Sequence, residues 1–389
     1  MAKIKRIIGV VTTSRADYGI YYPLLKRLTQ TDGLELKLIV TGMHLSKSFG
    51  YTVDEIERDG FPIETKIETL TSLDTPEGTT KSMGLGLTKF AEFFQRSTPD
   101  ILVVLGDRFE MFAAALAALP FSIPIAHIGG GAVTEGAFDD SLRHALTKIA
   151  HLHFVETENY RKRIIKMGEM PWRVSLCGAL SLDNLKERKR KPLDEINGLL
   201  KTKIKNPFLI VSYHPVTREL GKSDSQIISL FEALDQCDEH LVFSSPNADP
   251  AGRFLAEKIE HFVSRRPDQR TYLKSFGSEI YLSLMAIAKA MIGNSSSGIV
   301  EAASFGLPVV NIGIRQKGRD NGINVIHVNS DTSGIVNGLK KAVSKKFRKS
   351  IDLEKNIYDQ GGASKRIIEV LQKVPLDDNL TIKRFFDSI

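Results

Sequence analysis

The sequence predicts an α/β protein made of two Rossmann-like, doubly wound halves. Short apolar or β-branched runs alternate with longer amphipathic segments, as parallel strands alternate with crossover helices. A charged stretch without strand-like runs, residues 183–207, interrupts the alternation near the middle of the chain, and the alternation then restarts. The chain of 389 residues is also longer than one compact core usually is, so two domains are expected.

The first half supplies five expected strands with helical patterns between them. The strand candidates are 6–12, 34–42, 101–106, 124–128 and 153–157, and the clearest helical patterns are 21–30 and 87–96. The second half repeats this design. Its strand candidates are 208–215, 240–246, 270–276, 290–297, 307–313 and 324–328, and a last helix is expected at 361–374.

These elements predict an N-terminal Rossmann-like domain at 1–182, a linker at 183–206 and a C-terminal Rossmann-like domain at 207–360. Residues 361–389 are expected to return to the N-terminal domain as a helix. Ligands of doubly wound sheets bind outside the carboxyl ends of the strands. We therefore expect the active site in a cleft between the two domains.

The composition argues against several classes of protein. The longest apolar stretch, 111–128, is interrupted by Pro120 and Pro124, so no membrane helix is predicted. The N-terminal apolar run lacks a small-residue cleavage site and is interpreted as a first strand rather than a signal peptide. Two cysteines, Cys177 and Cys237, argue against a disulfide framework or a cysteine metal site and fit a cytoplasmic protein.

The net charge of +7 does not predict a nucleic-acid partner. Basic residues concentrate at 186–192 and 340–349, without the interleaved aromatic residues of an RNA-binding module. A small anion such as a nucleotide diphosphate is a better match for a few placed cations.

The strongest chemical signal is GNSSSGIVEAASFG, residues 293–306. A strand leads into glycines and three hydroxyls, and an apolar periodic helix is expected to follow. Ser295 and Ser296 suit a phosphate at the positive end of that helix, although an ordinary capped helix explains the motif equally well. Arg315 in the loop after the next strand, and Arg15 after the first strand, favour a diphosphate site in combination.

Two further residues follow strand candidates. Asp107 comes at the carboxyl end of a fully apolar strand, where a lone carboxylate is more often a helix cap. His214 occupies the equivalent place in the second half, where a histidine beside a proline turn is often structural. Together, facing each other across a cleft, they suit proton transfer or phosphate binding.

The stretch 127–148 joins three consecutive glycines to an expected helix that begins with Asp139 and Asp140. Asp139 and Arg143 share a face at i, i+4 spacing, whereas the paired aspartates also suit the helix dipole alone. His151 and His153 lack partners at metal-ligand spacing, so strand packing is favoured over a metal site.

Eight landmarks, in chain order, resemble those of the UDP-N-acetylglucosamine 2-epimerase family and are most similar to its hydrolysing branch in sialic and legionaminic acid synthesis. They are SRADYG, VTGMH, GDRFE, DDSLRHALTKIAH, HPVT, PNADPAG, GNSSSGIVE and RQKGR. The resemblance implies a fold of the glycosyltransferase-B type and no metal or other cofactor. It also implies a reaction in which UDP leaves as the C2 proton is removed, and water adds to the resulting glycal. From UDP-N-acetylglucosamine, this releases N-acetylmannosamine for nonulosonic acid biosynthesis.

The resemblance assigns roles to individual residues. Asp107 and Asp139 match acid/base carboxylates, and His214 matches a histidine at the diphosphate. The residues that match substrate contacts are Arg143 and His144 near the sugar, Arg15, Ser295, Ser296 and Arg315 at the phosphates, Glu301 at the ribose, Asn247 in the PNADPAG loop, and Phe276 and Tyr281 at the uracil.

One landmark departs from the family pattern. Relatives commonly read HIxGGE where this chain has Gly129 at the x position and Ala132 in place of the glutamate. Neither residue can transfer a proton, so Asp107 and Asp139 act alone, or Glu135 supplies a carboxylate, or turnover is impaired. The extra room also suits a sugar with a larger 4-substituent, such as the UDP-linked 2,4-diacetamido-2,4,6-trideoxyhexose of the legionaminic route.

The leading hypothesis is a hydrolysing UDP-N-acetylglucosamine 2-epimerase. The alternatives are the same reaction on the diacetamido sugar, a UDP-sugar-binding relative with impaired turnover, and a glycosyltransferase of the same fold. The resemblance further implies a homodimer or homotetramer.

Overall fold

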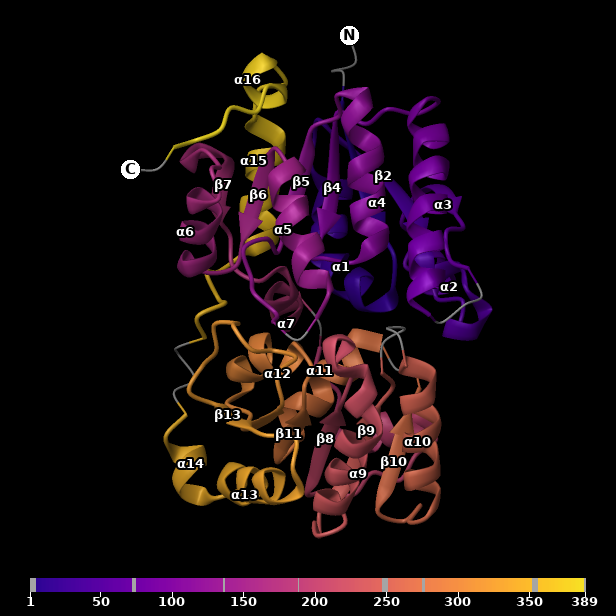
Figure 1. The fold of residues 1–389 in the computed structure, drawn as a ribbon, viewed down its shortest axis with the longest axis vertical. Helices are drawn as coiled ribbons and strands as arrows, with labels where there is room; N and C mark the ends of the chain where they lie inside the picture. The colour runs from indigo at the N-terminus through magenta and orange to yellow at the C-terminus, as the bar shows by residue number, and fades with distance from the viewer. Residues whose placement is uncertain are drawn as a thin grey trace. The chain divides into compact units, whose positions relative to one another are not determined.

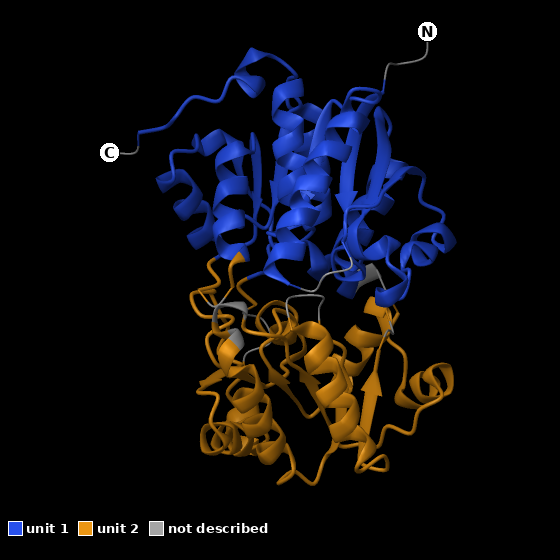
Figure 2. Cartoon of the chain, turned by 45° about the vertical axis from the view of Figure 1, so that its right-hand side comes forward, with its two compact units in different colours: residues 1–132, 139–187, 358–389 blue, residues 133–138, 188–357 orange. Residues whose placement is uncertain are grey.

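The computed structural model describes residues 5–71, 75–135, 137–187, 189–246, 251–274, 277–351 and 356–387. The chain forms two compact units, coloured blue and orange in Figure 2. Unit 1 comprises residues 1–132, 139–187 and 358–389, and unit 2 comprises residues 133–138 and 188–357. The first residues of the expected linker therefore belong to unit 1, and the loop 133–138 groups with unit 2.

Unit 1 is built on a parallel sheet of seven strands among the described residues, in the order β3-β2-β1-β4-β5-β6-β7. The strands are β1 (Arg6–Thr12), β2 (Leu34–Thr41), β3 (Ile63–Ile67), β4 (Ile101–Leu105), β5 (Ile125–Ile128), β6 (Leu152–Val155) and β7 (Val174–Leu176). The strand order reverses between β1 and β4, which pair in parallel. Such a reversal point is where doubly wound sheets bind ligands.

Helices cover both faces of this sheet (Figure 1). They are α1 (Arg15–Gln30), α2 (Val53–Arg58), α3 (Pro76–Phe94), α4 (Phe109–Ala118), α5 (Asp139–Ile149), α6 (Glu158–Lys166), α7 (Asn184–Glu187), α15 (Ala363–Lys373) and α16 (Asp378–Thr381). The C-terminal helix α15 packs against α1, and its Ile367 and Leu371 are fully buried in the core of this unit. Asp183 accepts hydrogen bonds from the Ala363 and Ser364 amides at the start of α15, so it is a buried cap rather than part of a solvated linker.

Unit 2 has a parallel sheet of six strands among the described residues, in the order β10-β9-β8-β11-β12-β13. The strands are β8 (Phe208–Ser212), β9 (His240–Ser244), β10 (Arg270–Leu273), β11 (Ala290–Gly293), β12 (Val309–Ile312) and β13 (Val325–Val328). Its helices are α8 (Leu193–Leu200), α9 (Ser223–Leu234), α10 (Gly252–Ser264), α11 (Gly277–Ile287), α12 (Ser297–Val300), α13 (Thr332–Ala342) and α14 (Lys345–Lys349). The order reverses between β8 and β11, as it does at the equivalent point of unit 1.

The predicted fold class is confirmed: both units are doubly wound parallel sheets. Two edge strands, β3 and β7, lack the continuous burial of the central strands and were not predicted. A helix does follow the serines, but it is short: α12 ends at Val300 and a separate 3-10 turn follows. Within the described ranges, no helix is both long enough and apolar enough to span a membrane.

Candidate active site

The turn after β1 is held by the carboxylate of Asp17. Asp17 accepts hydrogen bonds from the Ser14 amide at 2.9 Å, the Thr13 amide at 2.9 Å and the Thr12 hydroxyl at 2.9 Å. Ser14 and Asp17 also form a reciprocal capping box at the start of α1, which satisfies amides left free by the first helical turn. This turn fixes the backbone of Arg15, the first residue of α1.

His44 supports the same turn from the loop after β2. Its imidazole is fully buried and lies 3.0 Å from the Thr12 hydroxyl and 2.8 Å from the Thr52 hydroxyl. Asp17 and His44 stand inside the SRADYG and VTGMH landmarks, yet their side chains point into the protein. The structure therefore gives them a supporting role, whereas Arg15 is the partly exposed residue of this turn.

Arg143 of α5 contacts three groups of unit 1. Its guanidinium donates to the Asp107 carboxylate, to Asp140 Oδ1 at 3.0 Å and to the Ala132 carbonyl oxygen at 3.1 Å. The Arg143 side chain is 1% exposed, whereas that of Asp107 is 26% exposed. Hydrogen bonds from a guanidinium to carboxylates are charge-assisted and stronger than bonds between neutral groups. The structure thus brings together two of the predicted site residues, Asp107 and Arg143, and adds Asp140, which was not predicted as a site residue.

His127 of β5 also supports the loop that carries Asp107. Its Nε2 lies 2.7 Å from the Gly106 carbonyl oxygen. Burial lowers the pKa of His127 to about 3, so the imidazole is neutral and donates to this carbonyl. Gly106 itself has φ +70°, a backbone conformation that favours glycine.

Asp139 and His144 occupy the N-terminal half of α5. Asp139 is the first residue of the helix and is partly exposed. His144 Nε2 lies 3.6 Å from Asp140 Oδ2. Burial lowers the pKa of His144, which favours its neutral form, and its Nδ1 has no hydrogen-bond partner among the described residues.

Two of the three glycines before α5, Gly131 and Gly129, are subject to different structural constraints. Gly131 has φ +81°, and a Cβ there would lie 2.7 Å from the Tyr160 carbonyl oxygen, so packing alone requires glycine. Gly129 also has φ +81°, but a Cβ there would meet nothing closer than 3.8 Å. The side chain missing at 129 therefore leaves space, with the backbone in a conformation that disfavours larger residues. Ala132 is 2% exposed.

In unit 2, Asn294 links the loop after β8 to the loop after β11. Asn294 is fully buried, and its side-chain amide is bonded to the backbone of His214. Burial and the nearby Arg315 lower the pKa of His214 well below its usual value, so this imidazole is neutral. Arg315 Nη1 and Gln316 Nε2 donate to the Asn294 carbonyl oxygen at 3.1 Å and 2.8 Å. Asn294 thus joins three strand-end loops and was missed because an asparagine inside GNSSSG looks like an ordinary turn residue.

The loop between β11 and α12, residues 294–296, is here called the serine loop, and it contacts α11. The Tyr281 hydroxyl hydrogen-bonds with Ser297, Ser212 and Ser295. Burial raises the pKa of Tyr281, and these hydrogen bonds offset part of that shift. Ser296 precedes the single turn of α12, and Glu301 follows it. Tyr281 of α11 therefore contacts the serine loop in this structure.

Glu135 lies in the loop 133–138 and pairs with Lys317 of unit 2. The Glu135 amide donates to the Lys317 carbonyl oxygen at 3.1 Å, and Lys317 Nζ lies 2.8 Å from Glu135 Oε2. The Glu135 side chain is 49% exposed.

Two other predicted site residues, Asn247 and Phe276, lie outside the described residues. Across the described ranges, no group of three or more histidine, cysteine or carboxylate side chains forms a metal-binding cluster.

Comparison with known proteins identifies relatives over nearly the full chain. A family model described as UDP-N-acetylglucosamine 2-epimerase matches residues 26–372. The GDP/UDP-N,N'-diacetylbacillosamine 2-epimerase (hydrolyzing) of Campylobacter jejuni is 37% identical, covering 98% of this chain and 99% of the relative. The UDP-N,N'-diacetylbacillosamine 2-epimerase (hydrolyzing) of Legionella pneumophila is also 37% identical, with the same coverage of 98% and 99%.

Among solved structures, the UDP-GlcNAc 2-epimerase of Neisseria meningitidis bound to UDP-GlcNAc has the same fold. The TM-score is 0.77 at 18% identity, covering 95% of this chain and 100% of that chain. At this identity, the likeness concerns the fold alone.

Proposed function

Because the chain belongs to the UDP-N-acetylglucosamine 2-epimerase family, we propose that it is a hydrolysing 2-epimerase of a UDP-linked 2-acetamido sugar. The observation that carries this proposal is the contact of the buried Arg143 with Asp107 and Asp140 at the reversal point of the unit 1 sheet. Such a group offers ionised carboxylates for proton transfer at neutral pH. The names of the two relatives support the hydrolysing outcome.

In the proposed reaction, a carboxylate removes the C2 proton and the C1–O bond to UDP breaks. The electron pair of the C2–H bond forms the C1–C2 double bond of a glycal, and UDP leaves with the C1–O pair. Water then adds its hydroxyl at C1, and a proton returns to C2 on the opposite face. The sum is one UDP-sugar and one water converted to UDP and the free 2-epimer.

We assign the proton transfers to unit 1. Asp107 contacts Arg143 and is partly exposed, which suits a general base. Asp139, at the start of α5, is the second carboxylate, and its place at the positive end of the helix favours its ionised form. Ala132 contributes no functional side chain.

We assign UDP binding to unit 2. Arg315 supplies a cation, and Ser295 and Ser296 supply hydroxyl donors, after the neighbouring strands β12 and β11. Neutral His214 is a hydrogen-bond donor that suits a diphosphate oxygen without carrying a charge of its own. Arg15 is the phosphate contact that we assign to unit 1.

We favour the UDP-linked 2,4-diacetamido-2,4,6-trideoxyhexose as the substrate. The names of both relatives refer to diacetylbacillosamine, a sugar of this kind. The open space beside Gly129 suits a sugar with a larger substituent at C4. UDP-N-acetylglucosamine is the second candidate, favoured by the description of the family model.

The test is incubation with each UDP-sugar in D₂O, with UDP followed by phosphorus NMR and the sugar by proton NMR. We expect UDP and a free 2-epimer to accumulate in equal amounts, with deuterium at C2 and a higher kcat/KM for the diacetamido substrate. A 2-epimer that retains UDP would contradict hydrolysis. Thermal stabilisation by UDP without any product would instead identify a binding protein, the candidate favoured by the missing side chain at Ala132.

A further inference from the structure

A buried carboxylate, Glu169, pairs with Lys148, which lies at the end of α5 remote from Asp139. Its side chain is 0% exposed, and it lies 2.6 Å from Lys148 Nζ, 2.8 Å from Lys383 Nζ and 3.2 Å from His153 Nε2. Lys148 belongs to α5, His153 to β6, and Lys383 to the last residues of the chain. Glu169 thus joins three elements, and the proposed mechanism does not use the side chains of Glu169, Lys148, His153 or Lys383.

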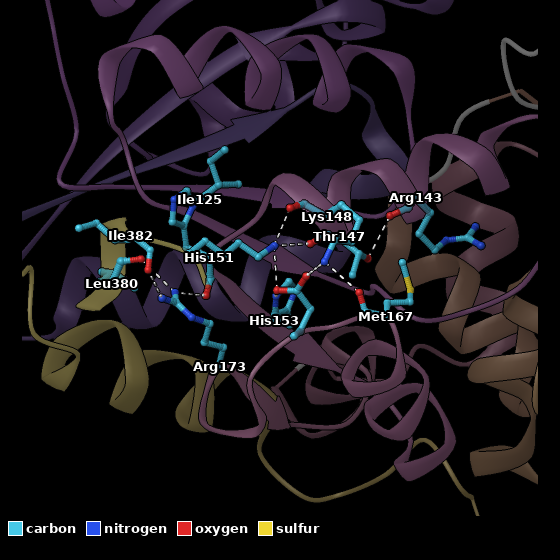
Figure 3. A network of polar contacts seen from close by, with 12 residues as sticks. Ile125, Arg143, Thr147, Lys148, His151, His153, Met167, Arg173, Leu380 and Ile382 are labelled. Carbon is cyan, nitrogen blue, oxygen red and sulfur yellow. Dashed lines mark hydrogen bonds and ion pairs between the residues drawn. The ribbon is translucent and has the colours of Figure 1, made fainter. Parts of the chain in front are cut away.

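Residues 377–387, near the C-terminal end of the described residues, are here called the tail segment. Buried Arg173 donates to the carbonyl oxygens of Leu380 at 3.0 Å and Ile382 at 3.3 Å, and to that of His151 at 3.0 Å (Figure 3). The amide of Phe386 donates to the Gly168 carbonyl oxygen at 2.9 Å. The tail segment is therefore held in place by contacts that do not involve Lys383.

Lys383 extends from the tail segment to the C-terminal turn of α5. Its Nζ donates to the carbonyl oxygens of Lys148 at 2.6 Å and Thr147 at 3.1 Å. Carbonyl groups of the last helical turn lack partners within the helix and carry the negative end of its dipole. A cation from elsewhere in the sequence thus caps the helix that carries Asp139, Asp140 and Arg143.

The capped turn is directly connected to the proposed site. The Thr147 hydroxyl donates to the Arg143 carbonyl oxygen at 3.1 Å, so the two residues are bonded within one turn. Arg143 in turn holds Asp107, Asp140 and the Ala132 carbonyl oxygen. A shift of α5 along its axis would therefore move the guanidinium that sets the Asp107 carboxylate.

We propose that Lys383 is a positioning residue for the reaction: it holds the C-terminal turn of α5 so that Arg143 and Asp139 keep their places. This inference rests on the proposed function and adds a dependence of turnover on the tail segment. Catalysis is sensitive to such placement, since a displacement of about 1 Å can lower a rate by about 100-fold.

Substitution of Lys383 is expected to leave the fold of unit 1 intact, because other contacts hold Glu169 and the tail segment. Lys148 still pairs with Glu169, and Lys148 Nζ also donates to the Met167 carbonyl oxygen at 2.9 Å. Arg173 still holds the tail segment. A Lys383→Met substitution keeps most of the side-chain volume and removes the ammonium group.

The charge of Lys383 is itself sensitive to pH. Burial lowers its pKa to about 8, although Glu169 opposes the shift and Lys148 and Arg173 add to it. The remaining titratable groups facing it, His151 and His153, have pKa values lowered by burial and are neutral above pH 7. An arginine at position 383 stays charged throughout this range.

The experiment compares Lys383→Met and Lys383→Arg with Lys373→Met, a control at an exposed lysine on α15. We expect Lys383→Met to lower kcat by about 10- to 100-fold, with the Kd for UDP and the Tm close to those of the control. Lys383→Arg is expected to restore kcat, and the ratio of its kcat to that of the wild type is expected to rise above pH 8. Hydrogen exchange of the α5 amides is expected to be faster in Lys383→Met.

A kcat equal to that of the control would overturn the inference. A kcat that falls only in proportion to a lower Tm, without restoration by Lys383→Arg, would also overturn it and leave Lys383 a purely structural residue. The hydrogen-exchange measurement does not depend on activity. Faster exchange of α5 in a protein whose wild type consumes no UDP-sugar would support the capping contact and place the failure with the proposed function.

Discussion

Asn294 and His214 exchange two hydrogen bonds. The His214 amide donates to Asn294 Oδ1 at 2.7 Å, and Asn294 Nδ2 donates to the His214 carbonyl oxygen at 2.8 Å. The Asn294 side-chain amide thus satisfies both the N–H and the C=O group of the His214 backbone, as a neighbouring strand does in a sheet. It fixes the loop after β8 against the loop after β11, where the proposed diphosphate contacts begin.

Replacement of Asn294 by alanine is expected to destabilise unit 2 and to weaken UDP binding. Two buried hydrogen bonds are lost and the His214 backbone groups are left without these partners, which corresponds to a loss of about 2–3 kcal/mol in the free energy of unfolding. Urea unfolding and calorimetric titration with UDP measure the two effects. Asn337→Ala, at an exposed position of α13, is the control. Equal stability of the two variants would contradict this role.

Replacement of Asp107 by asparagine is expected to lower kcat by about 10²–10⁴-fold, the usual effect of losing a general acid or base. The Kd for UDP is expected to change little, because the UDP contacts are assigned mainly to unit 2. Initial rates and UDP titration measure the two quantities, and Asp54→Asn, at an exposed position of α2, is the control. A normal rate in Asp107→Asn would remove this residue from the mechanism.

Introduction of glutamate at Ala132 tests the departure from the family pattern. The added carboxylate is expected to raise kcat for UDP-N-acetylglucosamine by about tenfold or more. Position 132 is buried, so the larger side chain is also expected to lower stability by about 1–3 kcal/mol. Ala132→Gln has the same size without the carboxylate and is expected to lose stability without gaining turnover. Equal turnover in the two variants would show that a carboxylate at 132 does not act on the sugar.

Because of Glu169, the free energy of unfolding of unit 1 is expected to decrease at acid pH. Burial alone would raise the pKa of Glu169, but hydrogen bonds from His153, Lys148 and Lys383 outweigh it and lower the pKa from 4.5 to about 2. A carboxyl group of this kind stabilises the fold above its unfolded pKa and loses that contribution as the pH falls through its folded pKa. We expect about 3 kcal/mol from Glu169 at neutral pH, lost between about pH 4.5 and 2.

The measurement is urea unfolding of the wild type and Glu169→Gln over that pH range. The difference in the free energy of unfolding is expected to be largest at neutral pH and to shrink as the pH approaches 2. Glu158→Gln, at a half-exposed position on α6, is the control and is expected to show little dependence on pH. A difference that stays constant with pH would show that the carboxylate charge is not the stabilising feature.

The central strands could be predicted from the sequence because both faces of a parallel sheet are buried. β4 and β8 are continuous apolar runs, and such runs have few other uses in an α/β chain. β3 and β7 are sheet edges with partly exposed residues, so their sequences do not carry that signal. The end of α12 likewise could not be predicted, because an apolar period does not reveal where tertiary packing ends a helix.

Residues that follow strands could also be anticipated as site candidates. Asp107, His214, Ser295 and Arg315 follow strands in the sequence, and because the strands of each sheet are parallel, their carboxyl ends lie at one edge of that sheet. Their supporting residues could not be anticipated. Asn294 and His127 act through backbone groups of other loops, and a backbone contact leaves no mark on the partner's side chain.

The α/β class, the two doubly wound halves and the family could be predicted from the sequence, because periodic burial and ordered landmarks are properties of the chain read in one dimension. Two features needed the folded chain: Arg143 contacts Asp140, Ala132 and Asp107 together, and Lys383 caps a helix formed by residues more than two hundred positions earlier. The physical reason is that ion pairs and helix caps depend on distance in space. A lysine near the end of a chain has the same local sequence whether its ammonium group faces water or the carbonyl oxygens of α5.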